Sequence, residues 1–202
     1  MANIAAIPSV GTSLATYLTR AYIPAVFPED VTKPSCTFEQ LSIGGLRNEN
    51  VDVPGDSVRV LIFLYRVSMN EHMRTSGRPT DPDMNPAPLS VDLHYLVTFW
   101  AGSAENEQLL LAWTLRQMHE TPVLDGSILS DEAGWAPDDV IHLIPEEISN
   151  EDLMRIWDTV EPNYRLSLSY IARIVRIDPT ETRDHLRVAA TRFNYGVPSS
   201  SP

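Results

Sequence analysis

Apolar and polar residues alternate along the segment from Val91 to Ala101. Because successive side chains of a strand point to opposite faces, this period of two predicts a half-buried strand. The apolar face would carry Val91, Leu93, Tyr95, Val97, Phe99 and Ala101, and the polar face Asp92, His94 and Thr98.

A helical pattern follows this strand after a short linker. Ser103 can supply the N-cap oxygen, and Leu111, Leu115 and Met118 recur at helical spacing, so these three side chains are expected to face the core. Pro122 has no backbone N–H to donate and should end the helix.

The first third of the chain predicts one helix and two strands. The helix would have Ser9 as its cap and would end at Pro24. A short strand is expected from Thr37 to Ile43, followed by a turn at Gly44–Gly45. The next strand, Val58–Val67, is apolar on both faces, so we expect it to lie centrally in a sheet that is covered on both sides.

The last third predicts two more strands and a helix. Val140–Ile144 forms a short strand pattern, and Ser149 with Asp152 makes a pair typical of a helix start. Trp157 on that helix should face the core. In the strand that follows, the core face would hold Leu166, Leu168, Tyr170, Ala172 and Ile174, and the polar face Arg165, Ser167, Ser169 and Arg173.

Three further segments complete the pattern. Residues 71–90 are dense in Pro, Asp and Asn and predict a long exposed loop, either mobile or in contact with a neighbour. Residues 187–195 predict a last strand, and residues 196–202 a disordered tail. The chain is therefore expected to form a single α+β (α/β-like) domain over residues 1–195, with a mixed β-sheet flanked by helices.

Composition narrows the classes of function. The 202 residues carry a net charge of -12 and a single lysine, Lys33, which argues against a sequence-independent grip on nucleic acid. No apolar run is long enough to span a bilayer, and the N-terminus lacks the features of a secretory signal, so we expect synthesis in the cytoplasm and no membrane insertion. Cys36 is the only cysteine, which rules out an internal disulfide.

The usual catalytic patterns are not found. No histidine has a second histidine one helical turn away, and neither a complete Gly-x-Ser-x-Gly elbow nor a phosphate-binding loop occurs. The acid pairs Asp81 with Asp83 and Glu146 with Glu147 are best interpreted as solvated carboxylates in turns and at helix starts. We therefore predict no catalytic residue, metal ligand or cofactor, and a protein that is not an enzyme.

Several linked segments carry a resemblance to a known family. They are the strand DLHYLVTFWA, the helix LLLAWTLRQMHETPVL, and the later pieces RIWDTV and YRLSLSYIARIVRID. In this order, over residues 9–178, they resemble the terminator or cap proteins of extracellular contractile injection systems, which are phage-tail-like particles. Longer members of that family continue into a further domain.

The resemblance implies a tail-terminator-like domain that assembles with copies of itself. Such a subunit would form a ring, expected to be a hexamer, at the baseplate-distal end of the particle, and would contact the contractile sheath and the inner tube. The particle could be released or remain inside the cell. Candidate contact residues are Arg74, Arg78, Asp81, Asp83, Arg165, Arg173, Arg187, Arg192, Phe193 and Tyr195.

Other interpretations of the same sequence stay open. Arg165 and Arg173 could instead form surface ion pairs with the many acids of the chain. The protein as a whole could be a small acidic adaptor that never polymerises, or an enzyme whose site is assembled from residues distant in sequence. A deep pocket with converging titratable groups would favour the enzyme.

Overall fold

A computed structural model describes residues 2–48, 57–70, 88–160 and 164–179. The loop predicted at residues 71–90 lies outside the described residues except for its last three positions, and the strand 187–195 and the tail 196–202 lie wholly outside them. The elements are α1 (Ala6–Tyr22), β1 (Ser35–Gln40), α2 (Ile43–Asn48), β2 (Ser57–Met69), β3 (Leu89–Ala101), α3 (Ala104–Glu120), β4 (Val123–Leu124), η1 (Asp131–Ala133), β5 (Ile141–Pro145), α4 (Asn150–Thr159) and β6 (Ser167–Ile177).

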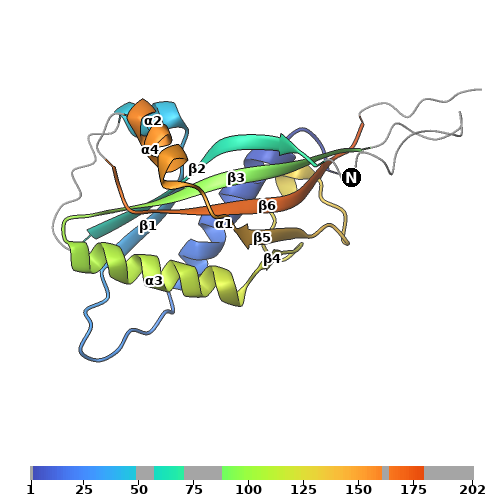
Figure 1. Ribbon diagram of the computed structural model, residues 1–202. Coiled ribbons are helices and arrows are strands. Elements are labelled where there is room, and N and C mark those ends of the chain that lie inside the picture. Colours follow the sequence, from blue (N-terminus) through green and yellow to red (C-terminus); the bar gives the residue numbers. More distant parts are fainter. Residues whose placement is uncertain (1, 49–56, 71–87, 161–163, 180–202) are drawn as a thin grey trace, which may run out of the picture.

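The strands of the described residues form one mixed six-stranded sheet in the order β1-β2-β3-β6-β5-β4. β1 pairs parallel to β2, and the other neighbours pair antiparallel. Helices lie on both faces of the sheet (Figure 1). The predicted fold class, an α+β domain with a mixed sheet flanked by helices, is therefore confirmed.

The larger core lies between the sheet and the two long helices α1 and α3 (Figure 1). Leu14 and Leu18 of α1 and Leu110 of α3 are fully buried there against the inner side chains of β2, β3 and β6. None of the helices in the described part of the chain is long and apolar enough to cross a membrane.

Two details of these helices differ from the sequence prediction. α1 begins at Ala6 rather than after Ser9, and Ser9 is buried inside the helix, where its hydroxyl donates to the Ala6 carbonyl at 2.9 Å. In α3, Ser103 is the N-cap and Met118 is buried as predicted, but Leu115 is exposed, and Trp113 with Leu110 takes the inward positions. Compared with the prediction, α3 is rotated about its axis so that its largest side chain, Trp113, faces inward.

A second, smaller core lies on the opposite face of the sheet. There α4 and the residue at its C-terminal end cover Leu96 and Trp100 of β3. The covering side chains are Leu153, Trp157 and Val160. The prediction that Trp157 faces a core is confirmed.

The prediction that β3 is half-buried is wrong, because nearly all of its residues are buried. α4 covers one end of its second face, and side chains of Arg66, Glu146 and Arg173 contact the polar residues at the other end. β2 is covered on both sides as predicted from Val58 to Phe63, but the prediction is wrong for its end, where Val67 is 47% exposed.

The turn predicted at Gly44–Gly45 is also wrong, because both glycines lie within the short helix α2. β1 ends at Gln40, three residues before the end predicted for it, and α2 starts at Ile43. The Ser42 hydroxyl accepts the Gly45 N–H at 3.1 Å, which stabilises the first turn of this helix. The chain therefore reaches the α4 side of the sheet directly from the end of β1.

Two irregularities in register change which side chains face the core. The pairing of β2 with β3 shifts between Leu64 and Arg66, and that of β3 with β6 shifts between Val91 and Leu93. On β6 the extra residue turns Val175 inward in place of Ile174, which was predicted to be the core residue. Bulges of this kind re-aim the side chains next to them, and both bulges flank the polar side chains described below.

The N-cap of α4 can be tested directly. The Ser149 hydroxyl accepts the Asp152 N–H at 3.1 Å and donates to the Asp152 carboxylate at 2.7 Å, as the sequence predicted. Ser149→Ala should lower the free energy of unfolding by about 1 kcal/mol. Urea denaturation would measure the loss. Asp158→Ala, an exposed change on the same helix, should stay within about 0.5 kcal/mol, and an equal loss in both variants would contradict the capping role.

Candidate functional site

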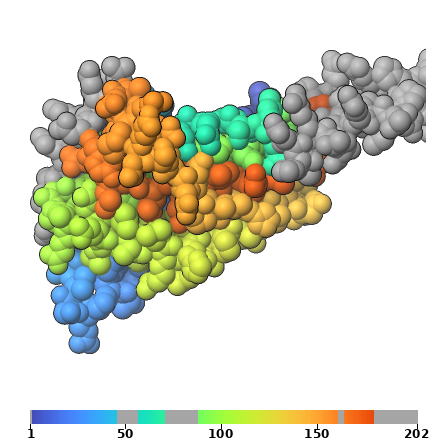
Figure 2. Space-filling view, in the orientation of Figure 1, coloured from blue at the N-terminus to red at the C-terminus, as the bar shows by residue number. Residues whose placement is uncertain are grey.

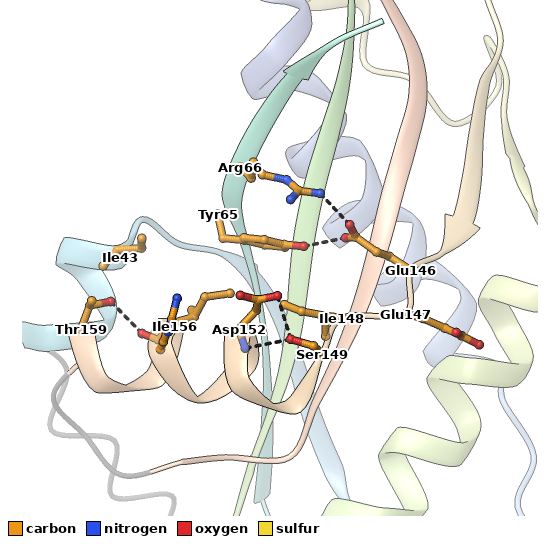
Figure 3. A pocket seen from close by; sticks show the side chains of 11 residues that line it. Ile43, Tyr65, Arg66, Glu146, Glu147, Ile148, Ser149, Asp152, Ile156 and Thr159 are labelled. Carbon is orange, nitrogen blue, oxygen red and sulfur yellow. Dashed lines mark hydrogen bonds and ion pairs between the residues drawn. The ribbon is translucent and has the colours of Figure 1, made fainter.

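α4 covers only one end of its face of the sheet, and a cleft opens where this cover stops (Figure 2). The cleft has a volume of about 580 Å³ and lies between α4, the start of α2, the middle of β2 and the segment that joins β5 to α4. Its apolar part is formed by Ile43, Ile148 and Ile156, and Tyr65, Arg66 and Glu146 close one side of it (Figure 3).

Glu146 is the centre of a hydrogen-bond network beside this cleft. Its Oε2 accepts the Tyr65 hydroxyl at 2.6 Å and the Ser169 hydroxyl at 2.8 Å. Its Oε1 lies 2.8 Å from the Arg66 guanidinium and 2.9 Å from His94 Nδ1. The Glu146 side chain is only 13% exposed, so one carboxylate joins β2, β3 and β6 to the segment before α4.

The electrostatics of Glu146 and Tyr65 follow from this contact. Burial alone would raise the pKa of Glu146, but hydrogen bonds from Tyr65, Ser169 and His94 outweigh it and hold the pKa of this carboxyl below its ordinary value. Burial, together with the hydrogen bond to Glu146, raises the pKa of the Tyr65 phenol to about 12. At neutral pH the pair is therefore a carboxylate and a neutral phenol.

His94 lies between a serine and this carboxylate. Its Nε2 is 2.9 Å from the Ser68 hydroxyl and its Nδ1 is 2.9 Å from Glu146, the order of contacts found in serine hydrolase triads. However, neither Ser68 nor His94 lines the cleft, and Arg66 lies 3.0 Å from Nδ1. A substrate held in the cleft would not touch the serine, so these contacts are better explained as a network that fixes β2 against β3.

A second polar cluster lies further along the same strands. Asp92 is 4% exposed, accepts two hydrogen bonds from the Asn70 amide at 3.1 and 3.2 Å, and pairs with Arg173 at 3.0 Å. The bulge in β6 lies next to Arg173. Among residues 2–48, 57–70, 88–160 and 164–179, no group of three or more His, Cys, Asp and Glu side chains converges as a metal site would require.

Two of the predicted contact residues lie in the described part of the chain. Arg173 pairs with the buried Asp92, and the Arg165 guanidinium stacks on Trp100 at 4.8 Å from the ring centroid. Both thus have partners within the chain. The other eight lie outside the described residues: Arg74, Arg78, Asp81, Asp83, Arg187, Arg192, Phe193 and Tyr195. Their role in an interface stays a prediction.

Sequence reasoning missed Glu146 as a site residue. The sequence groups it with Glu147 as a solvated acid, which holds for the exposed Glu147 but not for Glu146. One signal was available, because Asp92, His94 and Ser169 had been placed on the polar faces of two strands, and a buried polar face needs charged or hydrogen-bonding partners. Nothing in the sequence alone indicated that Glu146 supplies them.

Comparison with known proteins identifies what this fold resembles. A family model described as the Pvc16 N-terminal domain matches residues 9–190. This match confirms the resemblance to tail terminators drawn from the sequence. No curated protein sequence gave a significant match.

Two solved structures have a similar fold. One is the PVC sheath/tube terminator of an extracellular contractile injection system in its extended state, with 16% identity and a TM-score of 0.53 over 96% of this chain and 65% of that one. The other is the tube-terminating cap of the anti-feeding prophage, with 16% identity and a TM-score of 0.52 over 92% of this chain and 60% of that one. The chain thus spans somewhat under two thirds of the length of each.

Proposed function

Because this chain belongs to the Pvc16 N-terminal domain family, we propose that it is a structural subunit of the cap that terminates the sheath and inner tube of a contractile injection system. The observation that carries the proposal is the family match over residues 9–190. The similar folds of a sheath/tube terminator and of a tube-terminating cap support it. In this proposal residues 1–195 act as one domain.

The finer part of the proposal is that the subunits form a closed ring, expected to be a hexamer, at the baseplate-distal end of the particle. A stack of identical rings exposes at each end the surface that recruits the next ring, so a cap has to cover that surface without repeating it. Such a role needs protein interfaces and no catalysis, cofactor or metal. The partners are copies of the same chain, the sheath protein and the tube protein.

The experiment that tests this role uses purified protein and sheath–tube particles assembled without it. Light scattering over a dilution series should give the mass of about six subunits, and electron micrographs should show added density at one end of each particle. A particle preparation with its native cap in place serves as the control, because its ends should take up no further protein.

Two results would contradict the proposal. Protein that stays monomeric at every concentration and does not bind particle ends would favour the acidic adaptor. Binding along the whole length of the sheath, with both ends unchanged, would point to a sheath-associated protein rather than a terminator. Monomers that assemble only on particle ends would keep the cap role and locate the assembly signal in the sheath or tube.

A further inference from the structure

The cleft beside α4 combines an apolar floor with an acidic rim. Ile43 is 36% exposed, and Ile148 and Ile156 are partly buried beside it. The two arginines that line the cleft are already paired, Arg66 with Glu146 and Arg155 with Glu151. Glu147 and Asp152 on the rim are exposed and form no ion pair with another described residue.

These features define the chemistry of an occupant. An aromatic or aliphatic side chain would cover the isoleucines, and a positive charge next to it would meet Glu147 and Asp152. A volume of about 580 Å³ is within the range of protein pockets that enclose a small ligand, and it is large enough for an aromatic anchor with its neighbour.

The chain itself contains a segment of this chemistry. From Arg187 to Pro202 it carries Arg187 and Arg192 and no acid, whereas the whole chain has a net charge of -12. Arg192 is followed directly by Phe193, and Tyr195 comes two residues later. A basic residue beside an aromatic one is what the cleft would accept.

The cleft and the last described residues before this segment lie in different parts of the subunit. α4 lies towards one end of the sheet (Figure 1), and the cleft lies between α4 and the middle of β2. β6 ends at the other end of the sheet, where Ile177 pairs with Leu89 and the Asp178 N–H donates to the Ala2 carbonyl at 2.8 Å. A subunit whose socket and complementary segment are separate can join head to tail, and head-to-tail contacts form a ring when the rotation between neighbours closes.

We propose that residues 187–195 of one copy dock in the α4 cleft of a second copy, with Phe193 over the isoleucine floor and Arg192 against Glu147 and Asp152. The docking rests on the proposed function, because the ring that it would close is the proposed cap. It assigns the contact residues Arg192 and Phe193, which the sequence singled out, to a defined surface of the neighbour.

Disulfide cross-linking between co-expressed chains tests this docking. One chain carries Thr159→Cys, which lies in the cleft lining and leaves the floor and rim intact, and the other carries Asn194→Cys, which keeps both anchors. With a different tag on each chain, mild oxidation should give a covalent dimer that carries both tags. Met154→Cys is the matched control, because Met154 is exposed on α4 and does not line the cleft.

Cys36 is present in every chain, so two co-expressed wild-type chains, oxidised in the same way, measure the background of cross-links through this thiol. Burial raises the pKa of the Cys36 thiol to about 12, so it should contribute little.

Each outcome separates this proposal from the proposed function. A two-tag dimer from Thr159→Cys with Asn194→Cys, and not from Met154→Cys, supports the docking. A cross-link that forms only when both cysteines are on one chain shows that the cleft holds its own segment and overturns the exchange. Rings that cap particles but give no cross-link above the control overturn the docking and leave the cap role standing. A cross-link without binding to particles supports the docking and overturns the cap role.

A charge exchange adds a second readout. Glu147→Arg or Arg192→Glu alone should lower the cross-link yield about fivefold, the value of an exposed ion pair of about 1 kcal/mol. The two changes together should restore it. Glu132→Arg, an exposed reversal outside the cleft, should leave the yield unchanged. Equal losses in the double variant and the single variants would remove the Arg192 contact from the proposal.

Discussion

Replacing Trp157 by alanine is expected to lower the free energy of unfolding by about 3–5 kcal/mol, the range for a buried tryptophan. Trp157 is 4% exposed and packs on Trp100 with its ring centroid 6.3 Å away. It is the largest of the few side chains that hold α4 on the sheet. Its loss should therefore release α4 and open the cleft. Urea denaturation would measure the stability, and near-ultraviolet circular dichroism the loss of tryptophan packing.

Trp157→Phe is the matched control for this change. The Trp157 indole nitrogen is buried with no hydrogen-bond partner among the described residues, so phenylalanine keeps most of the apolar contact and removes an unpaired N–H. We expect a loss of about 1 kcal/mol or less. Similar losses for alanine and phenylalanine would contradict the argument that stability at this position follows the apolar contact kept by the ring.

Replacing Glu146 by alanine is expected to cost about 2–3 kcal/mol, because hydrogen bonds to charged groups are worth more than neutral ones and donors on four residues would lose their acceptor. The donors come from Tyr65, Arg66, His94 and Ser169, so the change should loosen β2, β3 and β6 together. Glu147→Ala is the neighbouring control. Glu147 is exposed, and its loss should stay within about 0.5 kcal/mol.

The same residue predicts a dependence of stability on pH. The pKa of Glu146 is lower in the folded protein than its ordinary value of 4.5, so its contribution is fully present above pH 4.5 and is lost as the pH falls through the folded pKa. Glu146→Gln should flatten the unfolding free energy below pH 4.5 relative to wild type. Denaturation curves between pH 3 and 7 would show this, and parallel curves for the two proteins would exclude Glu146 as a titrating group in that range.

Periodicity in the sequence predicted most of the elements, because their cause is local. The Ser103 and Ser149 caps and the covered strand β2 all follow from the spacing of residues that are neighbours in the chain. The smaller core on the α4 face of the sheet did not follow from local spacing. The burial of Leu96 and Trp100 on the outer face of β3 depends on α4, which begins about fifty residues later, and no local pattern in β3 reports that contact.

The candidate site shows more clearly that local sequence patterns do not reveal contacts between distant residues. Glu146 meets Tyr65 across 81 positions of the chain, and the side chains around it are aimed by a bulge in β2 that alternation alone does not predict. Ile174 shows what one extra residue does, since it exchanges its place in the core with Val175. The polar residues could be named from the sequence, but the partners that neutralise them could not.

The two margins of the sheet differ in length, and this gives the subunit a direction. β1 presents six residues at its margin, whereas β4 is only two residues long. A strand laid against β4 could form only about two backbone bonds, while one laid against β1 could form a full ladder. Among the described residues, the β1 margin therefore offers a longer edge for strand addition than the β4 margin, so copies that joined through their sheets would favour one direction.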